Sequence, residues 1–363
     1  MNARTWFTLA LAGICLLPIL PAAPAPGCCP APPPGKPVVN ADQTVILIWD
    51  AATKTQHFIR KASFQSEADD FGFLVPTPNE PALEESGNDA FPYLQKLTEP
   101  EIVKTTRPSD GISCGCATKF AAKGDLQHAP PPVKVLAEKE VAGFKAVVLE
   151  TRSAAALVAW LKKNGYAFSP EVEAWAKPYV EQGWKITALQ VAKDQDGKAK
   201  KSLTTAALRL TFQTEQPLFP YREPDSRAAA EALGARNRLL RIYFIADARY
   251  NGELTKETPW TGKVAWANKL SPESRKQALE LLKLPQTTGP AEWWLTEFED
   301  NWPYRVAPAD VTFARDPSQN TVKRPPIIQY VASPWPTDVM GYALIALLAV
   351  PPVYRRFRQR PTA

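Results

Sequence analysis

The sequence predicts an α+β fold: a largely antiparallel β-sheet ectodomain with about three helices, plus one C-terminal transmembrane helix. Strand-like apolar runs outnumber the helical patterns, and the helical patterns are grouped instead of alternating with single strands. Such grouping favours α+β over a parallel βαβ order. Hydrophobic residues make up 45% and charged residues 22% of the 363 residues, which is typical of a folded domain.

The predicted strands are apolar runs, either continuous or alternating with polar residues. Residues 44–50 (TVILIWD) are mostly aliphatic and β-branched, which predicts a buried strand. Residues 208–213 alternate, with Arg209 among the polar positions, which predicts one buried and one solvent-exposed face. Asp196 and Gly197 form a turn pair typical of a β-hairpin. The predicted strands cover residues 44–50, 56–64, 70–78, 145–150, 184–193, 203–214, 239–247 and 292–300.

The helices are predicted from their terminal residues. A serine stands at each expected N-cap, and Pro170 follows the second serine, where the first helical turn tolerates proline. A glycine ends each of the first two helices. The helices are expected between Ser153 and Gly165, between Ser169 and Gly183, and from Ser271 through Leu284.

The N-terminus predicts export. Arg4 precedes an apolar run over residues 6–20, and small residues and prolines follow, which is typical of a signal peptide over residues 1–27. The sequence leaves two ways of processing the signal peptide open: cleavage at the A-x-A pattern that ends at Ala25, or lipidation of Cys28. A Cys- and Pro-rich lead is expected over residues 28–39. The ectodomain then covers residues 40–334, with an internal boundary near residue 150.

The C-terminus predicts a membrane anchor. Residues 339–354 are uncharged and apolar, Trp335 precedes them, and an arginine cluster follows. These flanks favour one transmembrane helix over residues 335–354 and a basic cytoplasmic tail over residues 355–363. The predicted location is the cytoplasmic membrane, with the helix in contact with the lipid bilayer and the ectodomain on the extracytoplasmic side. A cleavable sorting tail has the same pattern and stays an alternative.

The distribution of charge argues against a nucleic-acid-binding protein, and the motifs argue against a serine hydrolase. The formal net charge is +6, but Arg4 and the C-terminal tail supply most of it, so nucleic acid is not an expected partner. Residues 111–115 (GISCG) fit the pattern of a serine hydrolase elbow, but His128 lies too close to Ser113 in the chain for that fold. No catalytic residue and no cofactor is therefore predicted.

Several blocks together resemble one bacterial family. They are the cysteines after the export signal and residues 44–64 (TVILIWDAATKTQHFIRKASF), 70–78 (DFGFLVPTP) and 157–191 (LVAWLKKNGYAFSPEVEAWAKPYVEQGWKITALQV). They are similar to the family catalogued as domain of unknown function 2330, over about residues 28–246. The resemblance implies an exported, often membrane-tethered bacterial protein without an assigned activity. The two adjacent cysteines depart from the single early cysteine of the family.

The cysteines predict disulfide bonds. Four remain after removal of the signal peptide, and an even number in an exported protein favours disulfides: Cys28, Cys29, Cys114 and Cys116. Neighbouring α-carbons lie about 3.8 Å apart, which disfavours a bond between the first two and leaves two pairings open. The alternative is a thiol-redox or metal-handling protein that uses these cysteines, with two further candidate ligands for copper(I) or zinc, His57 and His128.

A cluster of aromatic and acidic residues allows two interpretations. Aromatic rings beside carboxylates can bind sugars, but such a cluster more often forms a sheet core with a solvent-exposed opposite face. The cluster comprises Trp293, Trp294, Trp302, Tyr304, Glu292, Glu297, Glu299 and Asp300. The overall prediction is a membrane-anchored bacterial envelope protein that acts as a binding or scaffolding module instead of an enzyme, with an envelope protein or a polysaccharide as partner.

Overall fold

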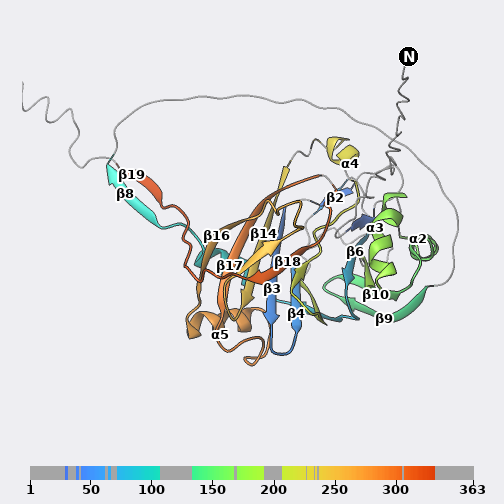
Figure 1. Ribbon diagram of the computed structural model, residues 1–363, viewed down its shortest axis with the longest axis horizontal. Helices are drawn as coiled ribbons and strands as arrows, with labels where there is room; N and C mark the ends of the chain where they lie inside the picture. Colours follow the sequence, from blue (N-terminus) through green and yellow to red (C-terminus); the bar gives the residue numbers. More distant parts are fainter. Residues whose placement is uncertain are drawn as a thin grey trace, which may run out of the picture.

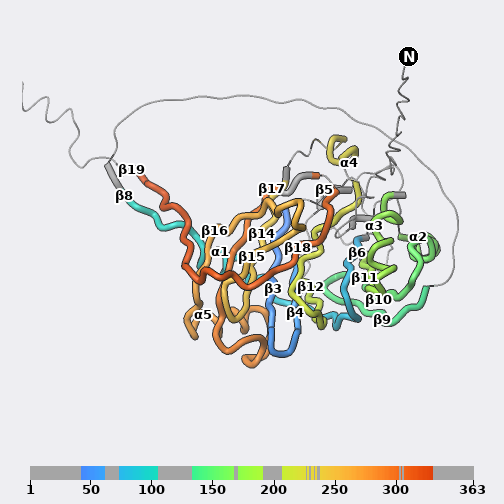
Figure 2. Tube along the Cα trace, viewed as in Figure 1, coloured from blue at the N-terminus to red at the C-terminus, as the bar shows by residue number. Residues whose placement is uncertain are grey.

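The described part of the chain forms four layers, helices on sheet on sheet on helices (Figure 1, Figure 2). The computed structural model describes residues 29–31, 38–40, 42–61, 64–66, 72–106, 133–166, 170–191, 207–225, 227–232, 234, 237–304 and 306–331. The architecture is mixed α+β with mostly antiparallel pairing, as predicted. No helix among these residues is both long and apolar enough to span a membrane.

The larger sheet has seven strands, and only β3 and β14 pair in parallel within it. Its strand order is β16 (Lys263–Lys269), β17 (Trp294–Pro303), β14 (Asn237–Ala246), β3 (Gln43–Asp50), β4 (Thr55–Lys61), β12 (Ala207–Gln213) and β7 (Ala82–Ser86). The sheet is covered on both faces, which explains the continuous apolar runs. Val45 and Leu47 pack between the sheets, while Ile46 and Ile48 pack under helices.

The smaller sheet has five strands and is antiparallel. Its strand order is β1 (Cys29–Ala31), β6 (Gly72–Thr77), β11 (Lys185–Val191), β10 (Phe144–Glu150) and β9 (Lys134–Val141). Phe73 and Phe144 face the larger sheet, and their rings pack edge to face at 5.2 Å. Leu74 and Val147 point the other way, toward two helices. The core between the sheets is therefore continuous across both.

Two pairs of helices form the outer layers. Helices α2 (Ala154–Lys163) and α3 (Pro170–Glu181) cover the smaller sheet, and α1 (Ala90–Leu97) and α5 (Pro272–Leu281) cover the larger one. The Ser153 hydroxyl accepts a hydrogen bond from the Ala156 amide at 3.2 Å, which caps α2 as predicted. Ser271 caps α5 in the same way. A fifth helix, α4 (Arg227–Ala232), is short.

Three small sheets complete the fold. One lies against the core between the larger sheets and contains β13 (Leu218–Phe219), β18 (Val311–Arg315) and β15 (Tyr250–Glu253). Another contains β2 (Val38–Asn40) and β5 (Phe64–Ser66). The third is a parallel ribbon of β8 (Ile102–Thr106) and β19 (Ile327–Val331), which projects from the body (Figure 1). We refer to this ribbon as the arm.

The structure corrects two predictions and adds two helices. The hairpin predicted at Asp196 and Gly197 is wrong, because β11 and β12 belong to different sheets and each already has two other neighbours. Arg209 was expected to be solvent-exposed, but it is buried: it forms an ion pair with Glu84 at 2.6 Å and donates a hydrogen bond to the Leu282 carbonyl at 3.3 Å. Three helices were expected; the described residues also contain α1 and α4.

Candidate binding groove

Most of the predicted cysteine site lies outside the described residues. This is the case for Cys28, Cys114, Cys116 and His128. The backbone of Cys29 is described in β1, opposite Leu74 of β6. The disulfides, and the alternative redox or metal site, therefore stay predictions.

His57 lies in β4 and is held by a structural contact. Its Nδ1 atom is 2.9 Å from the Thr211 hydroxyl of β12. Burial and the nearby Arg209 lower the pKa of His57 to about 4, so the ring is neutral at pH 7. Across the described ranges, no group of three or more His, Cys, Asp or Glu side chains is arranged to hold a metal ion. The structure thus gives His57 a role in sheet packing.

Three of the four aromatic residues in the cluster near β17 are core, and the side chain of Trp302 lies outside the described part of the structure. Trp293, Trp294 and Tyr304 are all buried, as the structural interpretation of the cluster predicted. The Trp293 ring also lies 5.3 Å below the guanidinium of Arg275. These three rings therefore offer no exposed surface on which a sugar could stack.

A groove of about 970 Å³ lies at the edge of the seven-stranded sheet, around β16 and β17. One wall is the segment before the arm: Val322 exchanges two backbone hydrogen bonds with Ala267 of β16, at 2.9 and 2.8 Å. The register of β16 against β17 shifts between Val264 and Trp266, so Ala265 is the extra residue of a β-bulge. The groove is lined by Leu239, Trp260, Thr261, Gly262, Lys263, Val264, Ala265, Glu299, Asp300, Asn301, Val322, Lys323, Arg324 and Pro325.

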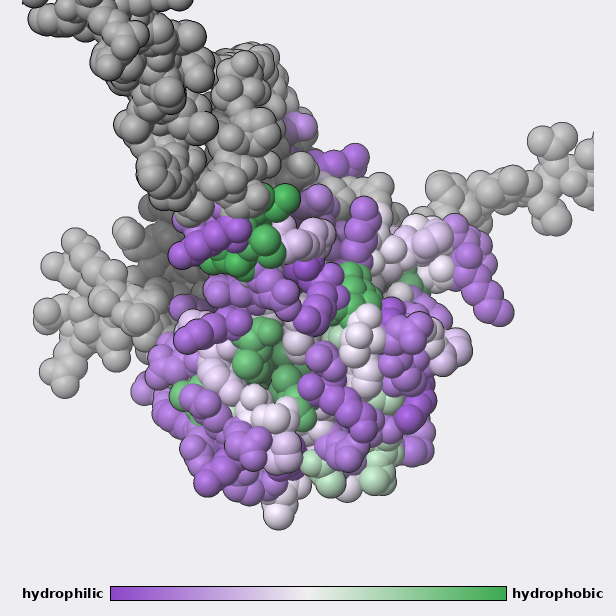
Figure 3. All heavy atoms as spheres, turned by 90° about the vertical axis from the view of Figure 1, so that its left-hand side faces the viewer, coloured by the Kyte–Doolittle hydropathy of each residue, from purple (hydrophilic) through white to green (hydrophobic). Residues whose placement is uncertain are grey.

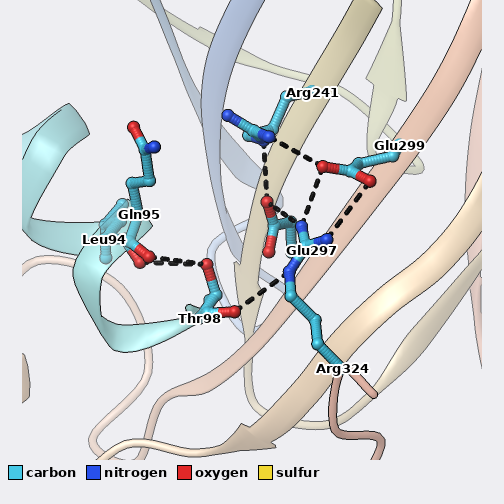
Figure 4. Close-up of polar contacts among 7 residues, drawn as sticks. All are labelled: Leu94, Gln95, Thr98, Arg241, Glu297, Glu299 and Arg324. Atoms are coloured by element: carbon cyan, nitrogen blue, oxygen red, sulfur yellow. Dashed lines mark hydrogen bonds and ion pairs between the residues drawn. The ribbon is translucent and has the colours of Figure 1, made fainter. Parts of the chain in front are cut away.

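A balanced ion cluster of two arginines and two glutamates lies beside the groove, and two of its members, Arg324 and Glu299, line the groove (Figure 4). Arg324 lies 2.8 Å from both Glu297 and Glu299, and Arg241 lies 2.8 and 2.7 Å from the same two carboxylates. Arg324 also donates to the Thr98 carbonyl at the end of α1, at 3.0 Å. Burial opposes ionisation of Glu299, but the hydrogen bonds from both arginines outweigh it and lower its pKa.

The second carboxylate of the groove, Asp300, is held by three neutral donors. The Tyr221 hydroxyl donates at 2.7 Å, the Thr261 hydroxyl at 2.7 Å and the Trp260 indole N–H at 3.2 Å. Asp300 thereby fixes the loop that leads into β16. A Cβ atom at Gly262 would lie 2.4 Å from the Trp260 ring, so this position requires glycine.

The chemistry available in the groove is that of anion binding. Both lining carboxylates already accept hydrogen bonds from internal partners. Lys263 is exposed, and no ion-pair partner for it occurs within the part of the chain that the structure describes. Lys323 pairs with Glu101 at 2.8 Å, but both side chains are about 70% exposed, and such pairs exchange readily with ligands.

Sequence reasoning singled out Glu299 and Asp300 but not the cations. Lys263 follows Gly262 in a short strand, KVAWANK, whose alternation could have revealed β16. Arg324 stands in a polar stretch without periodicity, so nothing local indicates that it is partly buried.

Comparison with known proteins gives one match. No curated protein and no solved structure matches the chain. The model of the family DUF2330, described as an uncharacterized protein conserved in bacteria, matches residues 21–314. This range includes every strand of the two large sheets and most of the groove, while Arg324 and β19 lie beyond it. The match covers well over half of the chain and agrees with the resemblance seen in the sequence, so the protein belongs to the DUF2330 family of bacterial proteins.

Proposed function

We propose that this protein is an exported, single-pass membrane protein of the bacterial envelope whose groove binds an anionic polysaccharide. The sequence of the two termini supports export and anchoring. The observation that carries the binding role is the groove of about 970 Å³, whose carboxylates are engaged internally while Lys263 is left unpaired among the described residues.

The form of the groove suits a polymer better than a small apolar ligand. It is open along the sheet edge, and its lining mixes charged side chains with Asn301 and Thr261, which can hydrogen-bond to hydroxyl groups. Exposed lysines attract carboxylate or sulfate groups without needing a fixed geometry. Binding is therefore expected to be moderate in affinity and sensitive to salt.

The test compares alginate, which carries carboxylates, with dextran, which is neutral, using the detergent-solubilised full chain in isothermal titration calorimetry. Lys263→Glu should weaken alginate binding about tenfold, because a charge reversal near an anionic group costs on the order of 1–2 kcal/mol at the surface. The matched control is Lys269→Glu, on the same strand but outside the groove lining. It should leave the affinity unchanged.

Two results would refute the binding role. One is the absence of alginate binding, and the other is an equal loss with both variants, which would show that only the net charge matters. Binding of dextran with the same affinity as alginate would refute the anionic preference.

A further inference from the structure

The arm exposes aliphatic side chains that soluble proteins normally bury. Ile102 and Val103 of β8 are 63% and 46% exposed, and Ile327 and Ile328 of β19 are 53% and 52% exposed. Figure 3 views the side from which the arm projects, where hydrophobic residues interrupt a largely hydrophilic surface. An exposed apolar patch of this kind commonly marks an interaction site.

The register distributes these side chains over both faces of the arm. Ile102 pairs with Ile327, and Val103 pairs with Ile328. Paired residues share a face and successive residues alternate, so each face has one aliphatic pair. A flat protein partner could cover one face only. A surrounding apolar phase covers both, and a two-stranded ribbon needs such support because it is marginally stable in water.

The base of the arm is fixed to the body. Arg324 donates to the Thr98 carbonyl at 3.0 Å and lies 2.8 Å from both Glu297 and Glu299 of β17. The Ile327 amide donates to the Glu101 carbonyl at 2.8 Å, which joins the two chain segments at the start of the arm. Pro325 and Pro326 stiffen the approach to β19. The arm is therefore held in a set direction relative to the sheets.

The chain connects the end of the arm to the predicted membrane anchor. β19 ends at Val331, and the apolar segment begins at Val339. The seven residues between them span at most about 25 Å when fully extended. The end of the arm is therefore tethered within reach of the headgroup region of any bilayer that holds the apolar segment.

We propose that the arm inserts into the lipid interface beside the anchor, with its four exposed aliphatic residues at the boundary of headgroups and acyl chains. This inference rests on the proposed membrane anchoring. Lys104, which follows on β8 and is exposed, can extend its ammonium group toward lipid phosphates. The arm then fixes the distance and orientation of the body above the membrane.

The test is hydrogen–deuterium exchange of the full chain, measured in nanodiscs of phosphatidylcholine and phosphatidylglycerol and in amphipol. Amides of residues 102–106 and 327–331 should exchange at least about fivefold more slowly in nanodiscs, because lipid excludes water from the arm. Amides of α5 should not differ. The double variant Ile102→Asn/Ile328→Asn should lose this protection, while Val135→Asn, at a 43% exposed aliphatic position on β9, should keep it.

Equal exchange of the arm in both environments would overturn the proposal. Equal and strong protection in both would also overturn it, because the protection of the arm would then not depend on a lipid bilayer. Carbonate extraction of cell membranes tests the anchor separately. Release of the full chain would refute the anchoring and the arm placement together, whereas retention with an unprotected arm would refute the arm placement alone.

Discussion

Replacing Asp310 with asparagine should remove a loss of stability that the wild-type protein undergoes as the pH rises from about 4 to 6. The Asp310 carboxylate accepts hydrogen bonds from the Tyr179 hydroxyl of α3 at 2.9 Å and from the amides of Tyr221 and Arg222 at 2.9 and 3.1 Å. It thus connects the helices on the smaller sheet to the chain after β13. Burial raises the pKa of Asp310 from 3.8 to about 6, although Arg222 and these donors oppose the rise.

The size and sign of the effect follow from linkage. Between pH 3.8 and about 6, the folded protein holds a proton on Asp310 that the unfolded chain has lost. The contribution of Asp310 to the unfolding free energy of the wild-type protein is therefore fully present below pH 3.8, and it is lost as the pH rises through 6. At about 1.4 kcal/mol per pKa unit, the loss reaches at most about 3 kcal/mol. Asparagine does not ionise, and its amide oxygen can still accept from both backbone amides.

The assay is urea unfolding of wild type and Asp310→Asn as full-length chains in one detergent, at intervals from pH 4 to 7.5. The difference in unfolding free energy isolates Asp310, because all other ionisable groups are common to both proteins. The variant should gain relative to wild type as the pH rises from 4 to 6, and the gain should then level off. A difference that is independent of pH, or that shrinks with rising pH, would refute the reasoning.

Three further changes probe the rest of the fold. His57→Gln should act in the opposite direction: the lowered pKa of about 4 means that wild type loses stability as the pH falls from 6.5 to 4, and the variant should lose less in the same titration. Gly262→Ala should displace the Trp260 ring and so shift tryptophan fluorescence. The overpacking should lower the unfolding free energy by about 1–3 kcal/mol, which a fall in melting temperature would reveal. Arg238→Met should cost about 3–5 kcal/mol in urea unfolding because it removes the buried ion pair between Arg238 and Glu223, and adding Glu223→Gln should restore part of the loss.

The sequence predicted the central strands well because their pattern has a direct physical cause. Every residue from Val45 to Ile48 is buried, since both faces of β3 are covered, and a continuous apolar run follows. The caps of α2 and α5 were equally predictable, because a serine hydroxyl and a backbone amide meet within three residues. Local chemistry is sufficient for such elements.

The partition into two sheets and the groove could not be predicted in this way. Alternation identifies Leu208 and Leu210 of β12 as core residues, but it does not show that the opposite face is covered or which strands lie beside β12. Buried Arg209 looks like any polar position in an alternating strand until the carbonyl end of α5 is placed over it. The contact from Arg324 to Thr98 joins residues 226 positions apart, and no local pattern encodes such a contact.

The place of β3 in the larger sheet has a consequence for folding. Its parallel neighbour is β14. Next to this strand pair, the Leu239 amide donates a hydrogen bond to the Asp42 carboxylate, and these two residues are 197 positions apart in the chain. The outer neighbour of β4 is β12, which also comes late in the chain. At 5–20 residues per second, roughly 10 to 40 s of synthesis separate β3 from β14. Non-local pairing of this kind forms slowly. The centre of the larger sheet therefore cannot form until β14 has been synthesised, and β3 and β4 wait for that time without the strands that flank them in the folded protein.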